Sequence, residues 1–135
     1  MKIFGIGTDI VKTSRIKKIL SNKLIINKIF HIKEIQRCKK TYKIHNCFAK
    51  RFAAKEAFSK ALGTGISRGI KFNEIVILNK KNGKPYVKLL NNTKLIVEKL
   101  LKKKKYKISL SISDESNYAV AFVTISIWKK TKFIN

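Results

Sequence analysis

Acidic residues are scarce in this sequence. Seven Asp and Glu face 32 Lys and Arg among 135 residues, which gives a formal net charge of +25. Only two of the acids are Asp, and Pro85 is the single proline. An acid that stands among apolar residues is therefore conspicuous.

Long apolar runs and cysteine are scarce as well. No segment reaches the length that a membrane span needs, and the N-terminal MKIFGIGTDI lacks the apolar stretch and cleavage site of a secretory signal. We therefore expect a cytoplasmic protein with no membrane partner. Cys38 and Cys47 lie nine residues apart without a CxxC pair. That spacing does not favour zinc, and we expect two free thiols.

The positive charge favours an anionic partner without identifying it. It is carried by 28 Lys and 4 Arg in a chain that is also rich in Ile and Asn. AT-rich codons would produce the same bias, so drift on a solvated surface is an alternative explanation for part of the charge.

The patterns predict one α+β domain over residues 1–128, with a loose tail over residues 129–135. Apolar segments at 3–11, 72–77, 86–89, 106–113 and 118–128 are typical of strands, and Asn82-Gly83 predicts a hairpin turn. Strand 118–128 is so apolar that we expect it to be buried on both faces or to lie in an interface. We expect a mostly antiparallel sheet of hairpins with a long central helix packed across it.

The segment FAKRFAAKEAFSKALGTGI, residues 48–66, predicts that central helix, with a cap near Asn46 and a stop at Gly63. Its alanines recur every fourth residue, so another backbone can approach closely. Arg51 and Lys55 form a like-charge pair that costs a helix a few tenths of a kcal/mol, which suggests cations held for an anionic ligand. Chance neighbours in a basic chain are the alternative.

Asp9 lies in the apolar, glycine-broken segment IFGIGTDIV. A buried carboxylate needs a cation or hydrogen-bond donors, whereas a carboxylate at the end of a strand can cap the next helix. Both interpretations stay open for Asp9 on its own, and an ordinary surface pair with Lys60 stays open for Glu56.

The segment around Asp9 and the segment around Glu56 both resemble one family. GIGTDIVKTSRI and FAKRFAAKEAFSKALGTGI are similar to the two signature segments of the bacterial holo-acyl-carrier-protein synthases, the small phosphopantetheinyl transferases. The NGKP turn and the SIS…YAVA hairpin lie where that family has similar segments. The resemblance implies a Mg²⁺-dependent transfer of 4′-phosphopantetheine from coenzyme A to a serine of acyl carrier protein, in support of fatty acid biosynthesis.

The resemblance also implies roles for individual residues. Asp9 and Glu56 match the family's metal-binding acids, and Lys60 matches a basic position near the coenzyme A phosphates. We expect all three residues to be catalytic, with Lys60 donating a proton or stabilising charge at the leaving phosphate. The positions that match coenzyme A-binding residues are Arg51, Phe52, Lys55, Ser59, Gly63, Thr64, Gly65, Asn82, Gly83, Lys84 and Pro85. Where many relatives carry a His, this sequence has Asp114.

The family's small members form trimers with the active site between subunits, so the resemblance implies a homotrimer. Acidic acyl carrier protein would dock on the basic helix from Ser14, where Arg15, Lys17 and Lys18 would steer it. Two other classes compete with the enzyme. A nucleic-acid-binding module needs exposed stacking aromatics, but the aromatics here lie within apolar runs, so we expect no nucleic acid partner. A non-catalytic scaffold for acyl carrier protein predicts binding that survives loss of both acids.

Overall fold

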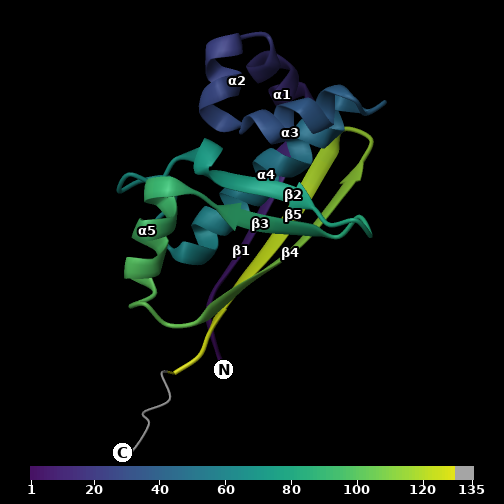
Figure 1. Cartoon of the computed structure of the whole chain (residues 1–135). Helices are drawn as coiled ribbons and strands as arrows, with labels where there is room; N and C mark the ends of the chain where they lie inside the picture. Colours follow the sequence, from purple (N-terminus) through teal and green to yellow (C-terminus); the bar gives the residue numbers. More distant parts are fainter. Residues whose placement is uncertain (130–135) are drawn as a thin grey trace, which may run out of the picture.

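The computed structural model describes residues 1–129, so the predicted tail from residue 130 onward lies outside the described residues. Within residues 1–129, no helix has the length and apolarity to cross a membrane. In chain order the elements are β1 (Lys2–Lys12), α1 (Thr13–Leu20), α2 (Lys23–Ile29), α3 (Ile32–Lys39), α4 (Ile44–Leu62), a 3₁₀ turn η1 (Phe72–Glu74), β2 (Ile75–Asn79), β3 (Pro85–Leu89), α5 (Asn91–Leu100), β4 (Tyr106–Glu115) and β5 (Tyr118–Ile127) (Figure 1).

The strands form one three-stranded antiparallel sheet and one hairpin. The sheet has the order β1-β5-β4, and β2 pairs with β3 through the turn that Asn82-Gly83 predicted. Helix α4 packs on β1 and β5, and the β2–β3 hairpin lies across the same helix (Figure 1). The prediction of an α+β fold with a central helix across antiparallel strands is therefore confirmed.

Close contact between β1 and α4 explains both the glycines of β1 and the alanines that recur along α4. Gly5 and Gly7 lie against the backbone of α4, where a Cβ on Gly5 would stand 1.8 Å from the Ala61 oxygen and one on Gly7 would stand 1.9 Å from the Ala57 oxygen. Ala57 is fully buried. Glycine on the strand and alanine on the helix thus bring the two backbones together, which places Asp9 beside α4.

Replacing Gly7 by Ala is expected to destabilise the fold by about 3 kcal/mol, because backbone atoms cannot move away as a flexible side chain can. Gly83→Ala is the matched control: its Cβ would meet nothing within 4 Å, although its φ of +88° imposes a strain of about 1 kcal/mol. Urea unfolding measures both variants. Equal losses of stability would contradict the contact.

Strand β5 is covered on one face only. Alternate residues, among them Ala119, Ala121 and Val123, are buried under α4. The opposite face of the sheet exposes large apolar side chains of β1 and β5, which are Ile6, Ile10, Tyr118, Val120 and Phe122. We call these five residues the outer apolar face. Of the two alternatives for this strand, burial on both faces is excluded within the protomer.

Two predictions about the start of α4 are wrong. The helix begins at Ile44 with Lys43 as its cap residue, so Asn46 lies inside it and donates a hydrogen bond to Asp114 Oδ2 (2.8 Å). Cys38 and Cys47 are joined by a disulfide rather than free, because the α3–α4 connection brings their Cα atoms within 5.4 Å. Pairing of this kind depends on how two helices pack, which the spacing of the cysteines does not reveal.

Candidate active site

Asp9 lies in the middle of β1, on the face that is turned toward α4. It follows Gly7 on that face, precedes buried Val11, and pairs with Ala121 in register. Lys60 of α4 donates from Nζ to Asp9 Oδ1 (3.0 Å) and to the Thr8 carbonyl oxygen (2.9 Å). Helix α1 starts only at Thr13 and has no side-chain cap. The structure thus excludes helix capping as the role of Asp9.

Glu56 lies on α4 next to Asp9. Partial burial raises the pKa of its carboxyl group, the negative charge of Asp9 raises it further, and the cations Arg15 and Lys60 oppose both effects. Arg15 comes from α1, and its guanidinium stands 5.2 Å from the centre of the Phe52 ring. Strand β1 and helices α1 and α4 therefore bring four charged groups together. We call Asp9, Arg15, Glu56 and Lys60 the acid cluster.

The two carboxylates of the acid cluster fit a magnesium ion that shares its coordination with a substrate. Mg²⁺ keeps several waters and is commonly bound through one or two carboxylates plus substrate phosphates. Within residues 1–129 no group of three or more His, Cys, Asp and Glu side chains could hold a metal by itself. The mutual repulsion of Asp9 and Glu56, which raises the Glu56 pKa, is what a bound cation would relieve.

Arg51 and Lys55, predicted to bind coenzyme A phosphates, are buried in the protomer and turned away from the acid cluster. Lys55 Nζ donates to Glu34 Oε1 (2.7 Å) and to the carbonyl oxygens of Phe72 and Ile75. Burial lowers the pKa of Lys55 to about 8, against the opposing effect of Glu34. The side chain of Lys55 is fully buried in contact with protein acceptors, so within the protomer it does not hold an anionic ligand, and coenzyme A binding by Arg51 and Lys55 stays a prediction.

Two predicted pocket residues also lie in the core. Phe52 is buried and stacks on Phe72 with ring centres 5.8 Å apart, and Ser59 is fully buried and donates to the Glu56 carbonyl oxygen (2.8 Å). The glycine-marked end of α4 is accessible instead. Gly63 closes the helix with φ +82°, a conformation that favours glycine, and the loop continues through Thr64 and Gly65. Of these predicted pocket residues, Phe52 and Ser59 are buried, whereas Gly63, Thr64 and Gly65 are at least partly exposed.

The NGKP turn joins β2 to β3 and is exposed. Lys84 N–H donates to Asn82 Oδ1 (3.1 Å), Gly83 N–H donates to the Lys80 carbonyl oxygen (2.9 Å), and Pro85 begins β3. Asn79 Nδ2 donates to the Gly83 carbonyl oxygen (3.0 Å) and so anchors the turn. Contact of this turn with coenzyme A stays a prediction.

The side chain of Asp114 is bound by two side chains of α4. Its carboxylate accepts from Asn46 and lies 3.2 Å from Lys50 Nζ, near the start of α4 and several turns from Glu56. The hydrogen bond from Asn46 and the neighbouring Lys50 lower the pKa of Asp114. Asp114 therefore stays ionised at neutral pH and fastens the end of β4 to α4, whereas a histidine there would be neutral or cationic.

The predicted docking cations separate into two groups. Arg15, Lys17 and Lys18 are all exposed on α1, but Arg15 also belongs to the acid cluster. A cavity of about 340 Å³ beside Arg15 is lined by Ile10, Val11, Lys12, Ser14, Arg15 and Lys18. Sequence patterns assigned Arg15 to a basic helix face, and no spacing signal indicated that this face turns toward Glu56.

Solved structures place the fold among the holo-[acyl-carrier-protein] synthases. The chain superimposes on a holo-[acyl-carrier-protein] synthase crystal structure from Neisseria meningitidis with a TM-score of 0.83 and 36% identity, covering 93% of this chain and 99% of that one. A Bacillus anthracis structure described as a complex with CoA (3′,5′-ADP) gives a TM-score of 0.74 and 34% identity, with 91% and 96% covered.

Sequence comparison identifies the family itself. Residues 5–123 match the sequence model of the 4′-phosphopantetheinyl transferase superfamily. A relative from Pelagibacter ubique, a holo-[acyl-carrier-protein] synthase, is 46% identical over 125 residues, which cover 93% of this chain and 98% of that protein. This chain belongs to the 4′-phosphopantetheinyl transferase superfamily.

Proposed function

We propose that this chain is a holo-[acyl-carrier-protein] synthase. It transfers the 4′-phosphopantetheine group of coenzyme A to a serine hydroxyl of apo-acyl carrier protein, releases adenosine 3′,5′-bisphosphate and supplies fatty acid biosynthesis. The observation that carries the proposal is the acid cluster: Asp9 and Glu56 come from two distant signature segments and lie together in a chain of this family. Residues 1–128 are the catalytic domain, and the cytoplasm is its site of action.

Asp9 and Glu56 would hold Mg²⁺. When bound, the ion neutralises negative charge on the pyrophosphate and orients the phosphoryl group for attack. We assign removal of the proton from the serine hydroxyl to a carboxylate of this cluster. Arg15 and Lys60 are cations on the same cluster, and we assign Lys60 to the leaving phosphate, where it stabilises the developing charge or donates a proton.

The direct test is a transfer assay on the purified protein. With coenzyme A, apo-acyl carrier protein and Mg²⁺, mass spectrometry is expected to show the carrier protein gaining the phosphopantetheine mass. EDTA should abolish the gain, and added Mg²⁺ should restore it. Carrier protein that binds but stays unmodified would support a scaffold and contradict the enzyme.

A Lys60→Ala variant is expected to lower kcat by about a hundredfold with a smaller change in KM for coenzyme A, because the lost charge acts mainly in the transition state. Lys94→Ala is the matched control, since Lys94 is exposed on α5. Steady-state kinetics separate the two constants. A change confined to KM would show that Lys60 only binds coenzyme A.

Docking of the carrier protein is assigned to the basic face of α1. Lys17 and Lys18 are exposed there. Arg15 of the same helix belongs to the acid cluster, so a carrier protein bound to α1 would lie beside that cluster. Acyl carrier protein is acidic, so complementary charge would speed the encounter and weaken with added salt.

The outer apolar face is assigned to a homotrimer with active sites between subunits. It exposes Ile10, Val120 and Phe122 among other large apolar side chains, and such a contiguous patch is typical of an interface. Phe122→Lys is expected to convert the assembly to monomers, whereas Asn92→Lys, at an exposed position on α5 away from this sheet, serves as the charge control. Light scattering gives the mass. A monomeric wild-type protein would contradict the trimer.

A further inference from the structure

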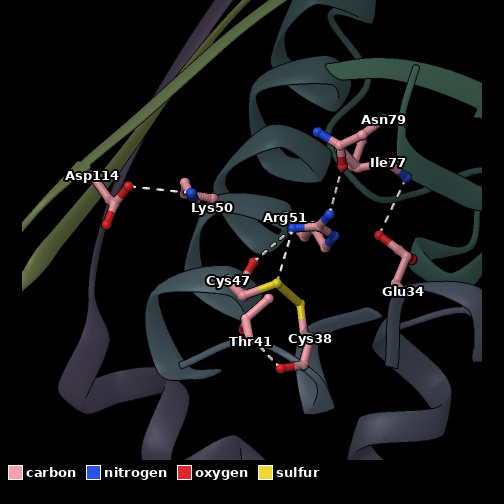
Figure 2. The surroundings of a disulfide bond; sticks show 9 residues. All are labelled: Glu34, Cys38, Thr41, Cys47, Lys50, Arg51, Ile77, Asn79 and Asp114. Atoms are coloured by element: carbon pink, nitrogen blue, oxygen red, sulfur yellow. Dashed lines mark hydrogen bonds and ion pairs between the residues drawn. A yellow bond between two sulfur atoms is a disulfide. The ribbon is translucent and has the colours of Figure 1, made fainter. Parts of the chain in front are cut away.

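Arg51 is a buried cation with an incomplete set of partners. Nη2 donates to Asn79 Oδ1 (2.8 Å), and Nη1 donates to the Cys47 carbonyl oxygen and to Cys47 Sγ (3.2 Å each) (Figure 2). Among the buried side-chain nitrogen and oxygen atoms of residues 1–129, Arg51 Nε alone has no partner. The Glu34 carboxylate nearby is already bound by Lys55. The acceptors that bind the Arg51 guanidinium are thus neutral, so a negative charge on Cys47 Sγ would stabilise this buried cation.

The two sulfur atoms of the disulfide are not equivalent. Cys38 lies in the last turn of α3, the negative end of that helix dipole, and Cys47 lies in the first turn of α4, the positive end. A helix N-terminus and a neighbouring guanidinium are two of the environments that favour a thiolate over a thiol. Both act most directly on Cys47, because Arg51 donates to Cys47 Sγ and Cys38 lies at the opposite end of its own helix.

The connection between the helices gives a route for a reagent. Both cysteines are buried, but residues 40–43 form a short exposed connection in which Tyr42 is fully exposed. Thr41 holds it by donating from Oγ1 to the Cys38 carbonyl oxygen (2.9 Å). We infer that a reagent reaches Cys38 when this connection opens, since residues 40–43 lie outside the α4–sheet contact.

We propose that Cys38–Cys47 is an exchangeable disulfide, a redox modification site in which Cys47 leaves as a thiolate held by Arg51. The thiolate of a dithiol reductant attacks Cys38 Sγ, the S–S bond breaks, and Cys47 takes the electron pair as a thiolate. The second thiol of the reductant then displaces Cys38, which leaves with a proton as a thiol. The reductant is oxidised to its disulfide, and the protein gains two electrons.

The same guanidinium connects the sulfur pair to the NGKP turn. Arg51 binds Asn79, and Asn79 anchors Gly83 (3.0 Å). A Cys47 thiolate attracts Arg51 more strongly than a disulfide sulfur does, so reduction loosens the hold on Asn79. This consequence for coenzyme A rests on the proposed function: reduction is expected to raise KM for coenzyme A by about threefold, within the range of ordinary coupling energies, with little change in kcat.

The test begins with the wild-type protein. It is reduced with dithiothreitol, kept folded, and alkylated with iodoacetamide at a series of pH values, and peptide mass mapping reports each cysteine separately. Cys47 is expected to react with an apparent pKa at least about one unit below the ordinary 8.5, and Cys38 at or above it. Equal profiles, faster reaction of Cys38, or no reaction of either thiol in the folded protein would overturn the proposal.

Variants then test the part played by Arg51. Arg51→Gln should move the Cys47 profile back to the ordinary range, and Arg51→Lys should keep most of the shift, because lysine restores the charge. Identical profiles in wild type and both variants would contradict the role of Arg51. KM for coenzyme A is compared before and after reduction, and an unchanged KM would overturn the link to the turn. Absence of transfer in both redox states would refute the proposed function and leave the alkylation result standing.

Discussion

A Glu56→Gln variant is expected to lose about a hundredfold to a thousandfold in kcat/KM for phosphopantetheine transfer. Gln preserves the shape of the side chain but removes one of the two negative charges that would hold the divalent ion. Without that ion, the charge that develops on the phosphoryl oxygens loses its main stabilisation. Steady-state assays at saturating Mg²⁺ measure the loss.

Two controls define what this loss means. Glu98→Gln also replaces a partly buried carboxylate by an amide, but on α5, and it should leave kcat/KM unchanged. Thermal unfolding should show that Glu56→Gln is no less stable than the wild-type protein, because it relieves repulsion between Glu56 and Asp9. A variant that is stable and fully active would remove Glu56 from the mechanism.

A Lys55→Met variant is expected to lose about 3–5 kcal/mol of stability, because it leaves the fully buried Glu34 carboxylate without its cation. The sequence interpretation predicts a different result: a coenzyme A-binding lysine would raise KM and leave stability nearly unchanged. Urea unfolding and KM for coenzyme A, measured on the same preparation, distinguish the two.

A double variant separates the lost ion pair from lost packing. Glu34→Gln combined with Lys55→Met removes both charges and should recover part of the stability, because no charge is left buried without a partner. If the double variant is as unstable as the sum of the two single variants, the ion pair is not what Lys55 contributes.

The fold could be predicted where a pattern is local. Asn82-Gly83 specifies a hairpin turn by itself, and alternation along Ile108, Leu110 and Ile112 specifies a strand with one inner face, as observed. Glycines on β1 and alanines on α4 predicted a close backbone approach, and Gly7 against Ala57 is that contact. Each of these signals depends on steric limits that hold for a short segment in any context.

The site could be predicted only in part, because which side chains contact each other depends on how the helices and strands pack. Resemblance brought Asp9 and Glu56 to attention, and the structure places them together. No periodicity indicated that Lys55 would be buried against Glu34, that Cys38 would meet Cys47, or that Arg15 would turn toward Glu56. Twenty-eight lysines in one chain look alike in sequence, and only helix packing shows that Lys55 is buried.

Binding of Mn²⁺ in place of Mg²⁺ tests the central claim most directly, because it needs no turnover. Titration of the protein with Mn²⁺ in the presence of coenzyme A, followed by electron paramagnetic resonance, is predicted to show one ion per protomer. Asp9→Asn and Glu56→Gln are each predicted to weaken that ion by about tenfold or more, and Glu98→Gln to leave it unchanged. Equal affinity in the wild type and both acid variants would contradict a shared ion at Asp9 and Glu56.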